Sequence, residues 1–269
     1  MSTPSAAVGV FGGSGFYSLL EGAREYSIST PYGPPSDAVT IGEIQGIPVA
    51  FLPRHGRHHS LPPHRINYRA NLWAMKELGV TRILGPCAAG SLQPHVQPGD
   101  FVVCDQLVDR TNARADTFYD GDVTTHISTA DPYCPVMRQL TVSTARELRI
   151  NVHEGGTMVV IQGPRFSTRA ESKWFREAGW EVINMTGYPE AVLARELEIC
   201  YANVSLITDY DSGLEGLPDV APVSHDQVIQ VFNDNNARLR DLIFSLISKL
   251  PDERTCVCAS ALQGARLEA

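Results

Sequence analysis

The sequence predicts a single-domain α/β fold in which a mixed, mostly parallel central sheet carries helices on both faces. Short apolar segments alternate with amphipathic segments along the chain, and this alternation is typical of a parallel sheet covered by helices. The length of 269 residues suits one large α/β domain, and we see no repeat or linker that would divide it. We therefore expect one domain over residues 1–269, in which residues 251–269 could form a tail.

In the first half of the chain, apolar runs bounded by turn residues predict strands, and apolar residues spaced three or four apart predict helices. The first strand ends at the glycine-rich turn Gly12-Gly13-Ser14-Gly15, and Gly46 separates the two strands of a hairpin. The segment from Pro86 to Ser91 is rich in small residues and is predicted to be a turn. The expected strands are 7–11, 40–44, 48–52, 82–84 and 101–104, and the expected helices are 67–79 and 135–148.

The second half continues the alternation. Thr168 with Glu171 and Ser224 with Gln227 have the spacing of a capping box, which marks the start of a helix. Pro189 suits the first turn of another helix. The expected strands are 158–161, 182–185 and 203–208, and the expected helices are 168–178, 189–198 and one from 224 to 250.

Composition and charge exclude several classes of protein. The chain is 43% hydrophobic and 19% charged, with 22 basic and 30 acidic residues and a net charge of −8. Such a surface repels phosphate backbones and anionic lipids, so we expect neither nucleic acid nor a membrane as a partner. No apolar run reaches the length of a membrane span, and no secretory leader is apparent. Six scattered cysteines indicate a reduced, cytoplasmic protein.

Ligands of open α/β sheets bind beyond the carboxyl ends of strands, and two segments there suit an oxyanion. In the turn at 12–15, glycine backbone amides and the Ser14 hydroxyl could hold phosphate, although a plain tight turn is the alternative. The sequence Arg54-His55-Gly56-Arg57-His58-His59 is a dense cluster of donors. Its alternatives are a metal site and a solvated basic loop. We expect no metal there, because the arginines would oppose a cation.

Two further segments suit a flat heterocycle. Phe166 and Met185 lie near predicted strand ends and could enclose a ring, with packing in the core as the alternative. Asp209 and Asp211 follow a buried strand and, spaced by two, point the same way. They could protonate and recognise a base, and a solvated loop or Mg²⁺ binding would fit that pattern alone equally well. Cys256 and Cys258 could form a short disulfide or bind metal, but we interpret them as part of a loose tail.

Taken together, these segments describe a site for a nucleoside and phosphate, and the motifs resemble a known family. GVFGGSGFY, PRHGRHH, NYRANLWAMKELG, QGPRFSTRAES, NMTGYPEAVLARELEICYA and TDYD are similar to the trimeric branch of the purine nucleoside phosphorylase superfamily, and within it to the methylthioadenosine phosphorylases. The resemblance runs from residue 8 to about residue 211. It implies phosphorolysis of S-methyl-5′-thioadenosine to adenine and 5-methylthioribose 1-phosphate. Broader purine nucleoside phosphorolysis is the alternative, and a non-catalytic nucleoside-binding module is less favoured.

The resemblance also implies a role for individual residues. Asp209 would protonate the purine at N7, and Asp211 would accept a hydrogen bond from the 6-amino group. Cys87 departs from the family pattern, which has threonine at this position, so only its backbone contact is expected to remain. The residues implied to bind phosphate are Ser14, Arg54, His55, Cys87, Ala88 and Thr186, and those implied to bind the nucleoside are Phe166, Ser167, Met185, His126 and His225.

The resemblance implies no cofactor, because inorganic phosphate is a co-substrate, and it implies a homotrimer or a dimer of trimers. His126 would reach the 5′-pocket of a neighbouring subunit. His225 stands where the methylthio-selective enzymes have valine, and histidine there is associated with enzymes that bind a 5′-hydroxyl. The alternative is that His225 lies in the first turn of the last helix without contacting a ligand. The sequence therefore leaves the preferred 5′-substituent open.

Overall fold

The structure is a computed structural model, and it describes residues 5–12, 21–214, 220 and 225–266. Within these residues an 11-stranded sheet forms the centre of the molecule, in the order β2-β3-β4-β1-β5-β10-β9-β7, with β11 paired to β5 and β6, and β8 paired to β6. The strands are β1 (Val8–Gly12), β2 (Glu21–Tyr26), β3 (Val39–Ile44), β4 (Ile47–Pro53), β5 (Arg82–Ser91), β6 (Phe101–Val102), β7 (Gln106–Arg110), β8 (Val152–His153), β9 (Thr157–Ile161), β10 (Val182–Asn184) and β11 (Cys200–Tyr210).

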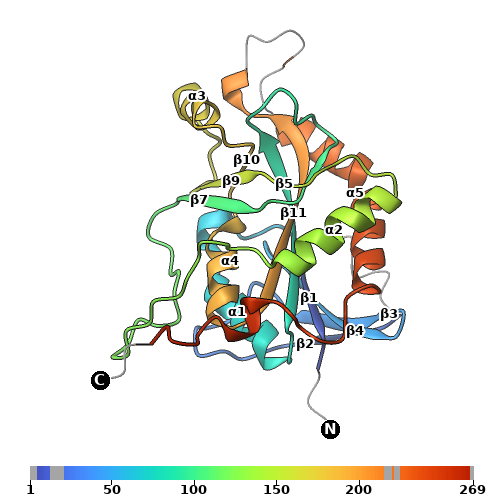
Figure 1. The fold of residues 1–269 in the computed structure, drawn as a ribbon, viewed down its shortest axis with the longest axis vertical. Coiled ribbons are helices and arrows are strands. Elements are labelled where there is room, and N and C mark those ends of the chain that lie inside the picture. The colour runs from blue at the N-terminus through green and yellow to red at the C-terminus, as the bar shows by residue number, and fades with distance from the viewer. Residues whose placement is uncertain (1–4, 13–20, 215–219, 221–224, 267–269) are drawn as a thin grey trace.

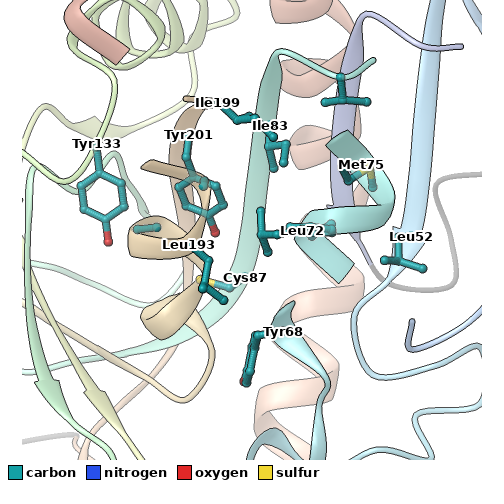
Figure 2. Close-up of a cluster of buried hydrophobic side chains, with 14 of the residues drawn as sticks. Leu52, Tyr68, Leu72, Met75, Ile83, Cys87, Tyr133, Leu193, Ile199 and Tyr201 are labelled. Atoms are coloured by element: carbon teal, nitrogen blue, oxygen red, sulfur yellow. The ribbon is translucent and has the colours of Figure 1, made fainter. Parts of the chain in front are cut away.

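Helices cover both faces of this sheet (Figure 1). Side chains of α1 and α4 pack in one apolar cluster, part of which Figure 2 shows. Side chains of α2 and α5 pack in a second cluster. Alternate residues of β11 contribute to the two clusters, as expected for a strand buried on both faces. The helices are α1 (Tyr68–Glu77), α2 (Pro135–Glu147), α3 (Arg169–Glu177), α4 (Gly187–Glu196) and α5 (His225–Ile247), and the short 3-10 helices are η2 (Pro63–Arg65), η3 (Ser212–Leu214) and η4 (Val257–Ser260).

The predicted fold class is confirmed, because the sheet is mixed, most strand pairs are parallel, and helices lie on both faces. The hairpin around Gly46 and the helices at 67–79, 135–148 and 168–178 are found within one to three residues of their predicted ends. The capping box at the start of α3 is present, with Thr168 and Glu171 bonding each other's backbone N–H groups. Ser224 of the second predicted capping box lies outside the described residues.

Two predictions about local structure are wrong. Residues 86–91 are not a turn, because β5 continues to Ser91 along its partner β11. Two glycines of this strand are closely packed: a Cβ on Gly85 would lie 2.0 Å from the Tyr201 hydroxyl, and one on Gly90 would lie 3.1 Å from Asp209 Oδ2. The described part of the C-terminal segment is not a loose tail either. Cys258 is buried, and Arg82 donates to the carbonyl of Pro251 at 2.5 Å.

No described helix combines the length and apolar character that a membrane span requires.

Candidate active site

The candidate site follows from a division of the sheet at β5. Along one edge, β5 pairs with β11 over its whole length, from Arg82 to Ser91. On the other edge, β1 pairs only as far as Leu84, and β10 arrives in antiparallel orientation at Gly90. Between these two points the described strands leave that edge of β5 without a partner. Cys87 and Ala88 lie in this interval, next to the ends of β1, β4 and β10.

Arg54 directly follows β4, and its guanidinium is buried at this division. Its Nε and Nη2 bond the two carboxylate oxygens of Glu190 on α4, and its Nη1 donates to the carbonyl of Pro86 at 3.1 Å. Tyr201 donates a further hydrogen bond to Glu190 at 2.6 Å. Burial by itself lowers the pKa of Arg54, but the charge of Glu190 and its hydrogen bonds together raise that pKa above its usual value. A guanidinium has five N–H groups, so two remain for a ligand.

The amino end of α4 lies against the same interval. Thr186 is the N-cap residue of α4, and its hydroxyl does not cap the helix. The side chain of Asn184 contacts the Cys87 sulfur at 3.3 Å, and Asn203 approaches the same sulfur at 3.4 Å. Backbone N–H groups at a helix start favour anions. Arg54, Thr186 and the backbone at Cys87 and Ala88 therefore make a site suited to an oxyanion.

His55 is half-buried beside Arg54 and is held as a neutral imidazole. Burial, with Arg54 and His59 nearby, lowers its pKa to about 4, although a bond to the backbone of Leu61 opposes the shift. Nδ1 lies 2.9 Å from the Leu61 carbonyl oxygen. A carbonyl only accepts, so Nδ1 carries the hydrogen and Nε2 is an acceptor. The ring stacks on His59 at 4.2 Å between centroids.

Asp209 and Asp211 lie further along the sheet, at the carboxyl end of β11. Asp209 pairs with Gly90 across a β-bulge, and the Asp211 N–H bonds the carbonyl of Ser91. Gly90 lies three residue steps along β5 from Cys87, which corresponds to about 10 Å. This spacing leaves room for a sugar between an anion at Cys87 and a flat base at the aspartates.

The two carboxyl groups are both buried, but they have different partners. Burial raises the pKa of Asp209 to about 6, and the charge of Asp211 adds to the increase; the Thr208 hydroxyl, at 2.7 Å, opposes it. Burial also raises the pKa of Asp211, but Ser167, Ser172 and the backbone of Ser212 bond its carboxylate and oppose the shift. Ser167 lies 2.5 Å from Asp211 Oδ2. Asp209 is therefore the better proton donor, and Asp211 the better acceptor.

Phe166 and Met185 differ from each other in burial. Phe166 is 41% exposed, so packing in the core does not account for it. Met185 is partly buried against the apolar cluster that contains Ile161 and Phe175, and its sulfur would lie 2.7 Å from a Cβ on Gly163. Ser167 follows Phe166 and binds Asp211, as described above. Phe166 thus presents an exposed ring on the segment that leads to the aspartates.

Two predicted site residues are not described at the level of their side chains, and a third lines another part of the surface. Ser14 lies outside the described residues. His225 is the first residue of α5, and its side chain is not described. His126 is exposed and lines a separate surface pocket of about 580 Å³ with Tyr119, Tyr188 and Glu196.

The structure bears on the two alternatives for residues 54–59, a solvated basic loop and a metal site. A solvated loop is wrong for Arg54, which is buried, whereas His58 is exposed. Arg57 pairs with Glu25 and Asp37. Among the described residues, the histidines of this segment do not form a group that could hold a metal ion.

Two residues of the site were missed in the sequence. Glu190 was not predicted, although a buried arginine requires a carboxylate and the first turn of a predicted helix offered one. Arg114 was also missed. It donates to the carbonyls of Gln162 and Met185 at 3.0 and 2.9 Å, and to that of Tyr188. Arg114 thereby ties the end of β9 to the start of α4, and a lone arginine in a loop gives no signal of this role.

The chain is similar to known proteins over almost its full length. Residues 7–248 match the model of the phosphorylase superfamily. A purine nucleoside phosphorylase from Streptomyces coelicolor is 52% identical, with 96% of this chain and 95% of the relative covered. An S-methyl-5′-thioadenosine phosphorylase from Thermofilum pendens is 50% identical, with 96% and 97% covered. The crystal structure of a methylthioadenosine phosphorylase from an antarctic soil metagenomic library matches with a TM-score of 0.92 at 39% identity, covering 98% of this chain and 93% of the other.

Proposed function

The chain belongs to the phosphorylase superfamily, and we propose that it is the pentosyltransferase that cleaves S-methyl-5′-thioadenosine with inorganic phosphate. The products are adenine and 5-methylthioribose 1-phosphate. The observation that carries this proposal is the buried pair Asp209 and Asp211, of which Asp209 has its pKa raised to about 6. The pair lies about 10 Å along β5 from the part of the strand that contacts Arg54 and the start of α4. Relatives and structural neighbours named as methylthioadenosine phosphorylases support the same substrate.

The arrangement suits the chemistry of the reaction. The bond from C1′ to the purine nitrogen breaks, the sugar gains oxocarbenium character, and the purine gains negative charge. A protonated Asp209 donates its proton to N7 and so stabilises the leaving base. Asp211, ionised and oriented by Ser167, accepts from the 6-amino group. A phosphate oxygen then forms the new bond to C1′.

Phosphate is a co-substrate in this proposal, and no cofactor takes part. Arg54 supplies its two remaining N–H groups, and Thr186 supplies its hydroxyl and the amino end of α4. A neutral His55 has an acceptor at Nε2, which suits the protonated oxygen of HPO₄²⁻. Met185 and Phe166 would contact the ribose and the purine. Ser14 and the backbone of Cys87 and Ala88 would complete the phosphate site.

A broader purine nucleoside phosphorylase is the second candidate, because the Streptomyces coelicolor relative bears that name and because the family resemblance associates a histidine at position 225 with binding of a 5′-hydroxyl. If His225 bonds a 5′-hydroxyl, His225→Val should lower kcat/KM for adenosine by about 1–3 kcal/mol of transition-state binding and leave methylthioadenosine unaffected or improved. An unchanged ratio of the two values would mean that His225 does not contact the substrate.

The proposal includes a homotrimer in the cytoplasm. His126 lines a pocket apart from its own aspartates, so a role at a 5′-group requires a neighbouring subunit. All six cysteines are free thiols, which supports a reducing compartment. Sedimentation equilibrium tests the assembly, and a monomeric active enzyme would contradict it.

The deciding experiment is a panel of nucleosides, each incubated with and without phosphate. We expect adenine to be released from methylthioadenosine only when phosphate is present. Asp209→Ala should lower kcat by about 10²–10⁴, the range for loss of a general acid. Asp109→Ala, which changes an exposed carboxylate on β7, is the matched control and should leave kcat unchanged. Phosphate-independent cleavage, or full activity of Asp209→Ala, would refute the proposal.

A further inference from the structure

Four cysteines from distant parts of the chain meet at the amino end of β11. Cys134 is the N-cap residue of α2, and Cys200 is the first residue of β11. Cys256 and Cys258 lie on the C-terminal segment, at the start of η4. Their four sulfur atoms all lie within 4.8 Å of one another, and three of the four residues are buried. We call these four residues the cysteine cluster.

The spacing of the sulfurs suits a metal ion. Zinc bound by four thiolates has Zn–S distances of about 2.3 Å, and a tetrahedron with these distances places its sulfurs about 3.8 Å apart. The sulfurs of Cys200 and Cys256 are 3.3 Å apart, and the others lie within the 4.8 Å limit. A disulfide requires about 2.05 Å. All four residues are free cysteines.

The surroundings of the cluster favour negative charge. Arg195, itself buried, approaches the sulfur of Cys258 at 4.0 Å. A small cavity beside the cluster is lined by Arg82 and Arg254, with Glu253 as the one acidic residue. Cys134 adds the amino end of α2, whose partial positive charge favours an anion. Four thiolates around Zn²⁺ carry a net charge of −2, and these groups offset it. Four uncharged thiols would gain little from these positively charged surroundings.

The backbone around the cluster is held in place independently of any ion. The Cys134 N–H bonds the carbonyl of Tyr201 at 2.8 Å, which ties α2 to β11. Arg82 bonds the carbonyl of Pro251, and Arg254 bonds that of Glu198 at 2.6 Å. These contacts bring the C-terminal segment to the start of β11. The ligands are therefore set close together by the fold, as a high-affinity metal site requires.

We propose that the cysteine cluster is a structural zinc site, in which Cys134, Cys200, Cys256 and Cys258 bind one Zn²⁺ as thiolates. Binding releases the thiol protons to solvent and involves no change in oxidation state. The ion joins α2, β11 and the C-terminal segment. Asp209 lies nine residues along β11 from Cys200, about 30 Å away, so the ion takes no part in cleaving the nucleoside.

The test is the metal content of the full chain, purified under reducing conditions without a metal-affinity tag, then measured by inductively coupled plasma mass spectrometry. We expect one zinc per chain in the wild type and in Cys104→Ser, which changes a buried cysteine outside the cluster. We expect no zinc in the Cys256→Ser, Cys258→Ser double variant. Because that variant could fail to fold, Cys256→Ser alone, at the least buried of the four positions, should weaken zinc binding at least tenfold.

Cobalt provides a second readout. The reduced, metal-free wild type titrated with Co²⁺ should develop the visible absorption of tetrahedral cobalt thiolate, with a one-to-one end point. Chelation should lower the melting temperature and leave phosphorolysis at moderate temperature unchanged. Absence of both zinc and the cobalt spectrum would overturn the proposal. So would intact-mass evidence that the freshly isolated cluster holds disulfides and cannot bind zinc after reduction.

Discussion

Burial of the ionised Asp209 side chain should lower the free energy of unfolding at neutral pH, and Asp209→Asn should remove this destabilisation. The carboxyl group is 5% exposed, and burial raises its pKa to about 6. In the unfolded chain an aspartate titrates near pH 3.9. The folded state therefore binds the proton more tightly than the unfolded state does. Asparagine has nearly the same shape, carries no charge, and can still accept the hydrogen bond from Thr208.

The size of the effect follows from the shift. About two pKa units at 1.36 kcal/mol each amount to about 3 kcal/mol. Below pH 4 the carboxyl group is protonated in both states, so ionisation costs the folded state nothing. Between pH 4 and pH 6 the unfolded state loses its proton first, and the stability of the wild type falls relative to the variant. Above pH 7 the difference should reach its full value.

The assay is urea unfolding of both proteins without phosphate at several pH values from 4 to 8. We expect Asp209→Asn to be more stable by about 3 kcal/mol at pH 7.5, with the difference vanishing near pH 4. The same variant should have lower kcat for methylthioadenosine, and its preference should move toward 6-oxopurines.

Asp100→Asn is the matched control. Asp100 is 7% exposed, but its carboxylate accepts hydrogen bonds from the Gln97 N–H, Asn151 and His153. An amide there would lose favourable bonds, so this variant should be less stable at pH 7.5. If Asp209→Asn were no more stable than the wild type at pH 7.5, burial would not hold Asp209 in the form that donates a proton.

Other consequences of the site can be tested in the same way. Arg54→Lys should raise KM for phosphate about 10–100-fold, the value of a hydrogen bond to a charged group, and change KM for the nucleoside little; equal changes in steady-state kinetics would indicate a structural role. Glu190→Gln leaves Arg54 as an uncompensated buried charge, so urea unfolding should show a loss of about 3–5 kcal/mol. Ser167→Ala removes a donor from Asp211 and should raise the pKa of that group, so the kcat/KM profile for adenine nucleosides should move to higher pH; an unchanged profile would count against Asp211 as the acceptor.

The sequence predicted the fold class and most of the elements that carry the site, because buried strands and capped helices are determined by local patterns. Long-range pairing was harder to predict. The small residues at 86–91 indicated a turn, because nothing local shows that β11 pairs with β5 as far as Ser91. The same reason explains why Glu190 was missed: its partner Arg54 lies 136 residues earlier.

The cysteines show the limit of local reasoning more clearly. Cys256 and Cys258 follow the charged run Asp252-Glu253-Arg254, and alone they suggested a loose tail. Their partners Cys134 and Cys200 belong to a helix start and a strand start, each of which is accounted for by apolar packing. Only the fold brings the four sulfurs within 4.8 Å. Spacing along the chain therefore carried no signal of the cluster.

With the proposed zinc site, the two ends of β11 should have opposite effects on stability, and this makes a last prediction possible. At the carboxyl end, ionised Asp209 costs about 3 kcal/mol, a large part of the 5–15 kcal/mol by which folded proteins are stable. At the amino end, the proposed zinc site would offset that cost. Sites about 30 Å apart without shared partners act additively. Asp209→Asn should therefore stabilise the Cys256→Ser protein by the same amount as the wild type at pH 7.5, within about 0.5 kcal/mol. A larger discrepancy in urea unfolding would mean that the two ends of the strand are coupled.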